Sequence, residues 1–325
     1  MNAPLRRTNA FVDRPPGRGR GDHAAGLIFA GLLAVGCAAS PGLPAGYTNS
    51  LGMQFNRIPA GEFLMGSDET AGRLAVAFPT IERERFELAD EAPVHRVRIT
   101  RPFYMGRHEV TVGQFRRYVQ ATGTVTQAER AGGGQVDEAG WVRRPGWTWA
   151  TPFGGGRAAA DDEPAVHVNF HEAQAFCRWA GGRLPGDAEW VSAAVTEQRA
   201  VPPGPFVRGK TYDYPTGDTP AGAQCLGDCG PDAARRAIRH GARLWRGDGH
   251  ARAGSTPAGV NGLHEMGGNA WEWVDEPPGA SGNAERRTRG GSWWYGAAQM
   301  RTDHLQAKPA DTAVVYIGWR CARDG

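Results

Sequence analysis

Alternating apolar and polar side chains mark the first strands of this chain. In residues 53–65 (MQFNRIPAGEFLM), apolar positions alternate with polar ones on both sides of a Pro-Ala-Gly turn, which is typical of short strands. Residues 95–104 show the same period, with Val97 and Ile99 on one face and arginines on the other. We therefore expect strands in both stretches and a charged surface loop between them.

Helical spacing begins after these strands. Thr111 is suited to cap a helix whose apolar face holds Val112, Phe115 and Val119 and which ends at Gly123. The pattern indicates an amphipathic helix with one buried face.

Two more helices are predicted beyond a short strand at residues 164–169. Asn169 and Glu172 have the spacing of a capping box, and the helix that follows should end at the glycine pair 181–182. Residues 183–185 (RLP) then lead into a third amphipathic helix, which contains Trp190.

Residues 262–273 (GLHEMGGNAWEW) combine a tight turn with a short extended segment. The glycines and the asparagine tolerate positive φ, and the alternation places Trp271 and Trp273 on one face and Glu272 on the other. One interpretation is a β-turn and a strand with core tryptophans and a solvated glutamate. The other is a calcium site, because such a turn offers backbone carbonyls close to Glu265 and Glu272, and calcium prefers oxygen ligands.

The remaining composition indicates a loop-rich protein. The 325 residues include 47 glycines, 23 prolines and 11 tryptophans, and residues 130–163 and 200–262 show little periodicity. Few helices, many short strands and long loops predict an α+β fold with little regular secondary structure.

The net charge of +3 arises at the N-terminus. Five of the 37 basic and two of the 34 acidic side chains lie in residues 1–37, so the remainder is balanced, with 32 of each. Nothing in this balance calls for nucleic acid as a partner.

The N-terminus has the features of an export signal. A basic stretch precedes the apolar run at residues 24–36, which is too short for a stable membrane span, and the run ends in LAVGC. This ending resembles a bacterial lipobox, with Cys37 lipidated, and Ala38 favours the outer membrane. The alternative is an ordinary secretory signal with an incidental cysteine. Residues 38–49 are expected to be a tether, and residues 50–325 the domain.

Four cysteines remain after Cys37, an even number that suits an oxidising compartment. They allow three pairings. Cys225 and Cys229 lie in one glycine-rich loop, so a local bridge between them would leave Cys177 with Cys321. A metal site at the CxxxC pair is the alternative, although no second Cys/His pair at zinc spacing accompanies it.

Nine segments in order resemble one family, the formylglycine-generating enzymes (sulfatase-modifying factors). The resemblance spans roughly residues 50–323. The segments are GEFLMG (61–66), PVHRV (93–97), GRHEVT (106–111), PAVHVN (164–169), AFCRWA (175–180), RLPGDAEW (183–190), GGNAWEW (267–273), RGGSW (289–293) and GWRC (318–321).

The resemblance implies a C-type-lectin-like fold with structural calcium, and it supports a Cys177–Cys321 disulfide. Carried over to this chain, the calcium ligands are the side chains of Glu265 and Glu272 and the carbonyls of Gly268 and Ala270. A weaker second site would use the residues Gln224, Cys225, Asp248 and His250.

The resemblance also identifies what is missing. The family's enzymes bind copper(I) with two cysteines shortly after Gly-Gly-Ser and oxidise a substrate cysteine with oxygen. Those two positions hold Tyr295 and Met300, and neither supplies the thiolate that copper(I) requires. We therefore expect no copper at these positions and no conversion of cysteine to formylglycine.

The residues of the family's substrate groove are partly retained. Trp271, Ser292 and Arg301 match groove positions, Tyr295 lies among them, and a nearby family tyrosine is Gln299. The resemblance therefore implies that the chain keeps part of the family's substrate groove.

Histidines offer another metal chemistry. His167 and His171 have a spacing known from non-haem iron sites, and His264 and His304 could join them. A structural role is the simpler interpretation of each, because His167 is on a predicted strand and His171 in the first turn of a helix.

Three functions follow from these observations. The first is a lipid-anchored, periplasm-facing maturation or assembly factor that binds a peptide or protein in the groove. The second is an oxidoreductase of the same superfamily that uses iron or another metal. The third is a ligand-display protein, but residues 293–317 contain no asparagine and two tyrosines, which is unlike such surfaces.

Overall fold

The computed structural model describes residues 44–68, 93–138, 140–276, 285–301 and 304–325. The predicted leader, Cys37, half of the predicted tether and most of the predicted surface loop lie outside these ranges. The helices are α2 (Val112–Thr122), α3 (Gln127–Arg130), α4 (Phe170–Trp179), α5 (Asp187–Val195) and α6 (Asp232–Arg236), with 3-10 turns η3 (Val260–Gly262) and η4 (Ala297–Met300). Within the described residues, no helix combines the length and apolar character needed to cross a bilayer.

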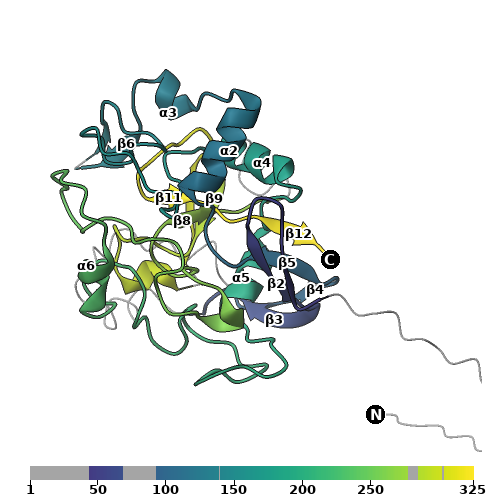
Figure 1. Ribbon diagram of the computed structural model, residues 1–325. Coiled ribbons are helices and arrows are strands. Elements are labelled where there is room, and N and C mark those ends of the chain that lie inside the picture. Colours follow the sequence, from purple (N-terminus) through teal and green to yellow (C-terminus); the bar gives the residue numbers. More distant parts are fainter. Residues whose placement is uncertain (1–43, 69–92, 139, 277–284, 302–303) are drawn as a thin grey trace, which may run out of the picture. The chain divides into compact units, whose positions relative to one another are not determined.

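The strands form four small sheets (Figure 1). One sheet has the order β1-β2-β5-β12 and another β10-β9-β8-β11, while β3 pairs with β4 and β6 with β7. The strands are β1 (Gly46–Thr48), β2 (Gln54–Ile58), β3 (Gly61–Met65), β4 (His95–Ile99), β5 (Phe103–Gly106), β6 (Gln135–Asp137), β7 (Trp141–Arg143), β8 (Trp271–Trp273), β9 (Glu285–Arg289), β10 (Gln306–Pro309), β11 (Ile317–Gly318) and β12 (Ala322–Asp324).

The predicted strands at the start of the chain are present, but their partners differ from a simple hairpin. β2 and β3 flank the predicted turn and join different sheets, β2 with β1 and β5, and β3 with β4. The predicted strand 95–104 is likewise divided into β4 and β5, because Pro102 lies between them and cannot donate a ladder hydrogen bond.

The domain begins earlier than the sequence pattern indicates. Residues 46–48 lie in the predicted tether, yet they form β1 and pair with β2. The reason is packing, since the Tyr47 ring stacks on Phe55 at 4.8 Å and meets Tyr104 edge-on at 4.9 Å. Regular pairing in the described part of the chain therefore begins at Gly46, inside the predicted tether.

The three predicted helices are confirmed, two of them with the caps predicted for them. Thr111 caps α2, which ends at Gly123 in the left-handed conformation, and Asn169 and Glu172 form the capping box of α4. The third helix is α5, whose Trp190 is fully buried. α2 and α4 pack side by side through Phe115 and Phe176 (Figure 1).

The predicted strand at residues 164–169 is wrong. Only Pro164 forms an isolated bridge, and His167 adopts φ +58°, which interrupts an extended run. The His167 ring is buried against Gly134, where an added Cβ would lie 2.0 Å from Nδ1, and its Nε2 is 2.9 Å from the Pro152 carbonyl. Tertiary packing of this imidazole overrides the strand pattern.

Candidate functional site

The turn at residues 267–270 has the backbone that the sequence predicts. Gly268 and Asn269 have φ of +80° and +58°, and a Cβ on Gly268 would lie 2.4 Å from the Gln224 carbonyl oxygen. β8 follows this turn, and Trp271 and Trp273 pack in the main apolar core while Glu272 points to the opposite side. The alternation predicted from the sequence is therefore correct, but Glu272 is not solvated.

Glu272 is held in a buried ion pair with Arg320. The guanidinium donates to both carboxylate oxygens, Nε to Oε2 at 2.7 Å and Nη2 to Oε1 at 2.6 Å, and the Trp190 indole donates to Oε2 at 2.7 Å. Arg320 also donates to the carbonyls of Gly106 and His264. Both charged side chains are fully buried, so this pair fixes β8 to the segment before β12.

Glu109 is another buried carboxyl group, close to the Glu272–Arg320 pair. Burial, together with the negative charges of Glu265 and Glu272, raises the pKa of Glu109 well above its ordinary value. Glu109 accepts hydrogen bonds from the Asn269 side chain at 2.7 Å and from the Ala270 amide at 3.0 Å. It therefore anchors the 267–270 turn, a role that the sequence reasoning missed.

The first predicted calcium set uses carboxylates that already have protein donors. Glu265 accepts from the Gly254 amide and from the amide and hydroxyl of Thr256, while Glu272 binds Arg320. A cation bound to Glu272, with the carbonyls of Gly268 and Ala270, would have to compete with the guanidinium. Calcium at this set stays a prediction.

The second predicted set is better placed for a hard cation. Gln224, Cys225 and Asp248 line one cavity of about 260 Å³, and Gln224 Oε1 is buried without a hydrogen-bond partner in the described part of the chain. Side-chain and carbonyl oxygens are the ligands that calcium prefers. A cation there would tie the 224–229 loop to the segment around Asp248.

His250, the fourth member of this second set, has one ring nitrogen that could serve as a ligand, because Nδ1 is buried without a hydrogen-bond partner in the described part of the chain, whereas the carbonyl already accepts from the Ile238 amide. Its ring Nε2 lies 3.0 Å from Glu163 Oε2. Burial alone would raise the pKa of Glu163, but hydrogen bonds from His250 and Arg157 outweigh it and lower the value to about 2. Glu163 is therefore ionised at neutral pH and pairs with Nε2 of the His250 ring.

Both disulfides are present. Cys177–Cys321 joins α4 to the segment before β12, and Cys225–Cys229 closes a loop. The Cys225–Cys229 pair is a disulfide in this structure rather than the metal-site alternative.

The two positions of the missing copper thiols are filled by packed side chains. The Tyr295 ring lies 5.7 Å from the rings of both Trp271 and Tyr316, and the Arg246 guanidinium lies 5.0 Å above it. Met300 is fully buried. Neither side chain offers the thiolate that copper(I) requires, so the family's copper site does not fit these residues.

The predicted groove is largely filled. Trp271, Ser292 and Gln299 are buried together with Tyr295, whereas Arg301 is partly exposed. Gly291 has φ +71°, and a Cβ on it would lie 3.0 Å from the backbone of Gln299, so this close turn favours glycine. Ser292, which follows the turn, is buried. The open space borders Arg301 instead.

A cavity of about 270 Å³ lies beside Arg301. Its walls include Leu64, Val191 and Val195, and its exposed carboxylates are Asp68 and Asp213. The Arg301 guanidinium hydrogen-bonds Tyr214. This opening can accept one or two side chains of a ligand.

The histidines do not gather around one point. His167 is fully buried, and burial lowers its pKa to about 4, whereas His171 is exposed. His264 bonds the Thr256 carbonyl at 2.9 Å, and His304 lies against Trp271 at 5.9 Å. The His167/His171 spacing therefore does not produce a shared ligand site.

The fold is a loop-rich α+β fold of the C-type-lectin-like type that formylglycine-generating enzymes have. A solved structure of PvdO from Pseudomonas aeruginosa has this fold, with a TM-score of 0.58 and 22% identity over 89% of this chain and 100% of that one. Residues 47–325 match the sulfatase-modifying factor enzyme 1-like domain. The chain belongs to this family.

Three relatives illustrate the range of this family. The formylglycine-generating enzyme of Streptomyces coelicolor is 30% identical over 88% of this chain and 94% of its own length. A hercynine oxygenase of Mycolicibacterium smegmatis is 29% identical (87% and 64%), and the inactive C-alpha-formylglycine-generating enzyme 2 of Mus musculus is 27% identical (91% and 94%). Proteins similar to this chain therefore include a formylglycine-generating enzyme, a hercynine oxygenase and a protein named as inactive.

Proposed function

We propose that this chain is an envelope protein, anchored through a lipid on Cys37, that binds a peptide or protein during maturation or assembly and does not generate formylglycine. The observation that carries this proposal is that Tyr295 and Met300, both buried, stand at the two positions where the resemblance implies copper-binding thiols. The inactive mouse relative supports the same interpretation, since its name describes a protein that keeps the domain without the activity.

The cavity beside Arg301 supports a particular ligand chemistry. Its apolar walls suit a leucine-like side chain, and its carboxylates, Asp68 and Asp213, outnumber the one guanidinium. Opposite charge next to an apolar pocket provides both affinity and register. The proposed ligand is therefore an exposed peptide segment in which an apolar residue adjoins lysine or arginine.

Peptide binding tests this proposal. Fluorescence anisotropy with two labelled peptides, one containing Leu-Lys and one Leu-Glu, should give tighter binding of the Leu-Lys peptide by about five- to tenfold at low salt. Asp213→Lys should remove that preference, because it reverses one of the two charges at the cavity.

Asp232→Lys is the matched control. Asp232 is exposed on α6 and does not line the cavity, so this variant makes the same charge change elsewhere. Equal affinity for both peptides, or an equal loss in the two variants, would show that the cavity is not the binding site.

The second candidate is an oxidoreductase that uses iron or another metal. It is favoured by the oxygenase relative and by the place of His304 beside Trp271. Mass spectrometry of the bound ligand distinguishes the two functions. A binding protein leaves the mass of its ligand unchanged in the presence of dioxygen, whereas an oxidoreductase that uses dioxygen changes it.

A further inference from the structure

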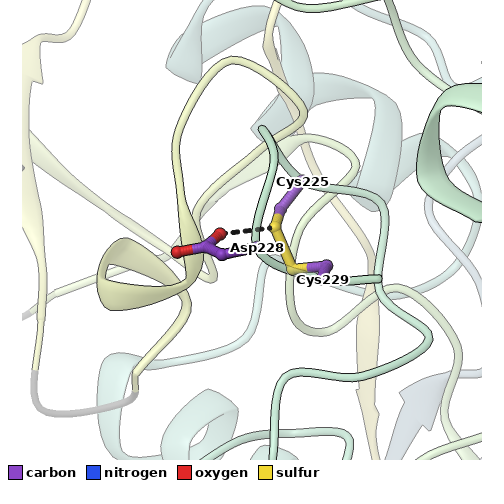
Figure 2. A group of neighbouring side chains, drawn as sticks. All are labelled: Cys225, Asp228 and Cys229. Carbon is purple, nitrogen blue, oxygen red and sulfur yellow. Dashed lines mark hydrogen bonds between the residues drawn. A yellow bond between two sulfur atoms is a disulfide. The ribbon is translucent and has the colours of Figure 1, made fainter. Parts of the chain in front are cut away.

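The loop of residues 225–229 carries a compact group of potential ligands. Figure 2 shows the Cys225–Cys229 disulfide beside Asp228, whose Oδ1 is 3.3 Å from Cys225 Sγ. Among the residues that the structure describes, this is the one set of three cysteine, histidine or acidic side chains whose donor atoms lie within 4.8 Å of one another.

This loop is docked on the segment that holds the two substituted copper positions. The Leu226 amide donates to the Tyr295 carbonyl at 2.9 Å, and the Ala297 amide donates to Asp228 Oδ1 at 2.9 Å. Met300 Sδ lies 3.3 Å from Cys229 Sγ. Three sulfur atoms from two segments therefore meet in one place.

We propose that Cys225, Cys229 and Met300 form a three-sulfur site that binds copper(I) once the disulfide is reduced. Thiolate and thioether sulfur are the soft ligands that select copper(I). The three side chains are at most 5% exposed, so protein atoms would enclose most of the metal's surroundings.

The distances suit a trigonal site. With metal–sulfur bonds of about 2.3 Å, as in zinc thiolates, the sulfurs of such a site lie about 4 Å apart. The Cα atoms of Cys225 and Cys229 are 5.8 Å apart, so their side chains can rotate to this separation, and Met300 Sδ is already near it. Asp228 is a hard ligand and keeps its hydrogen bond to the Ala297 amide.

Loading needs a dithiol reductant. The dithiol transfers two electrons and two protons to the Cys225–Cys229 disulfide, which becomes two thiols, while the dithiol becomes a disulfide. Copper(I) then replaces the two thiol protons, which pass to water, and the Met300 thioether donates an electron pair without losing a proton. The cavity of about 260 Å³ next to Cys225 provides an entry path.

This site differs from the copper site that the resemblance implies, because its thiolates come from another loop and only residue 300 is shared. It is also independent of the proposed peptide binding, which uses the cavity beside Arg301.

The test is an anaerobic titration of the full chain with copper(I) against a chromogenic copper(I) chelator, before and after reduction by a dithiol that is then removed. Alkylation and peptide mapping establish that Cys225 and Cys229 are reduced while Cys177–Cys321 stays intact. The reduced protein should bind one copper(I), the oxidised protein none at this site, and X-ray absorption should count three sulfur ligands.

Met300→Leu should weaken copper(I) binding by at least about tenfold, the loss that results even when an outer partner of a metal ligand is removed. Met105→Leu is the matched control, since Met105 is equally buried but lies in β5 in another cluster. Two sulfur ligands, unchanged affinity in Met300→Leu, or no more binding than in C225S/C229S would overturn the proposal.

Discussion

Arg320→Met is expected to lower the free energy of unfolding by about 3–5 kcal/mol, the usual effect of removing one member of a buried ion pair. Among the described residues, the substitution leaves the buried Glu272 carboxylate with the Trp190 indole as its one remaining donor, and it also removes donors from the carbonyls of Gly106 and His264. Urea denaturation followed by tryptophan fluorescence measures the loss.

The double variant R320M/E272L distinguishes the loss of the ion pair from the cost of leaving one buried charge without its partner. With both charges gone, no orphaned carboxylate remains, so it should be more stable than Arg320→Met alone. Arg96→Met is the surface control: the Arg96 and Glu62 side chains are 71% and 45% exposed, so it should cost less than about 1 kcal/mol. Equal losses in Arg320→Met and Arg96→Met would contradict the structural role of the buried pair.

C177A/C321A is expected to lower the free energy of unfolding by about 4–5 kcal/mol. A disulfide removes conformational entropy from the unfolded chain, and a bridge across a long loop removes the most. The two cysteines are 144 positions apart in sequence, and both are buried. The bridge joins α4 to the end of the chain, so its loss also loosens the attachment of β12. Thermal or urea unfolding under non-reducing conditions measures the effect.

C225A/C229A is the internal comparison. This bridge spans only 4 positions, so the same chain-entropy argument gives a loss of about 2 kcal/mol. Equal losses for the two pairs would mean that loop length does not determine the contribution of Cys177–Cys321.

Local features of the fold were predictable because their causes are local. The caps of α2 and α4 depend on residues three positions apart, and the alternation in β8 depends only on strand geometry. The fold as a whole was predicted through the resemblance rather than through these patterns, and the structural neighbour bears it out.

Ion pairs and side-chain packing between distant partners were not predictable, in contrast to the Cys177–Cys321 disulfide, which the resemblance supported. Glu272 is paired with a residue 48 positions away, and Arg289 binds Asp187 across 102 positions through bonds of 2.6 and 2.8 Å. Glu109, Asp187 and Arg320 all lie in the nine quoted segments, so the signal was present, but the sequence does not state which charges meet. His167 failed as a strand residue for the same reason, since its ring is placed by contacts with Gly134 and Pro152.

The candidate site shows the same division. The replacement of both copper thiols was evident from the sequence, whereas the filling of the groove by its own side chains and the opening beside Arg301 depend on packing. The contact between Met300 and Cys229 joins segments 71 positions apart and was not expected.

Mass spectrometry of a cysteine-containing sulfatase peptide, incubated in air with this protein and with copper(I) or iron(II), tests the central claim most directly. A formylglycine-generating relative serves as the positive control. The proposed function predicts that the peptide mass stays unchanged with either metal. Loss of the cysteine sulfur to give an aldehyde would contradict it, and gain of oxygen would establish the oxidoreductase alternative.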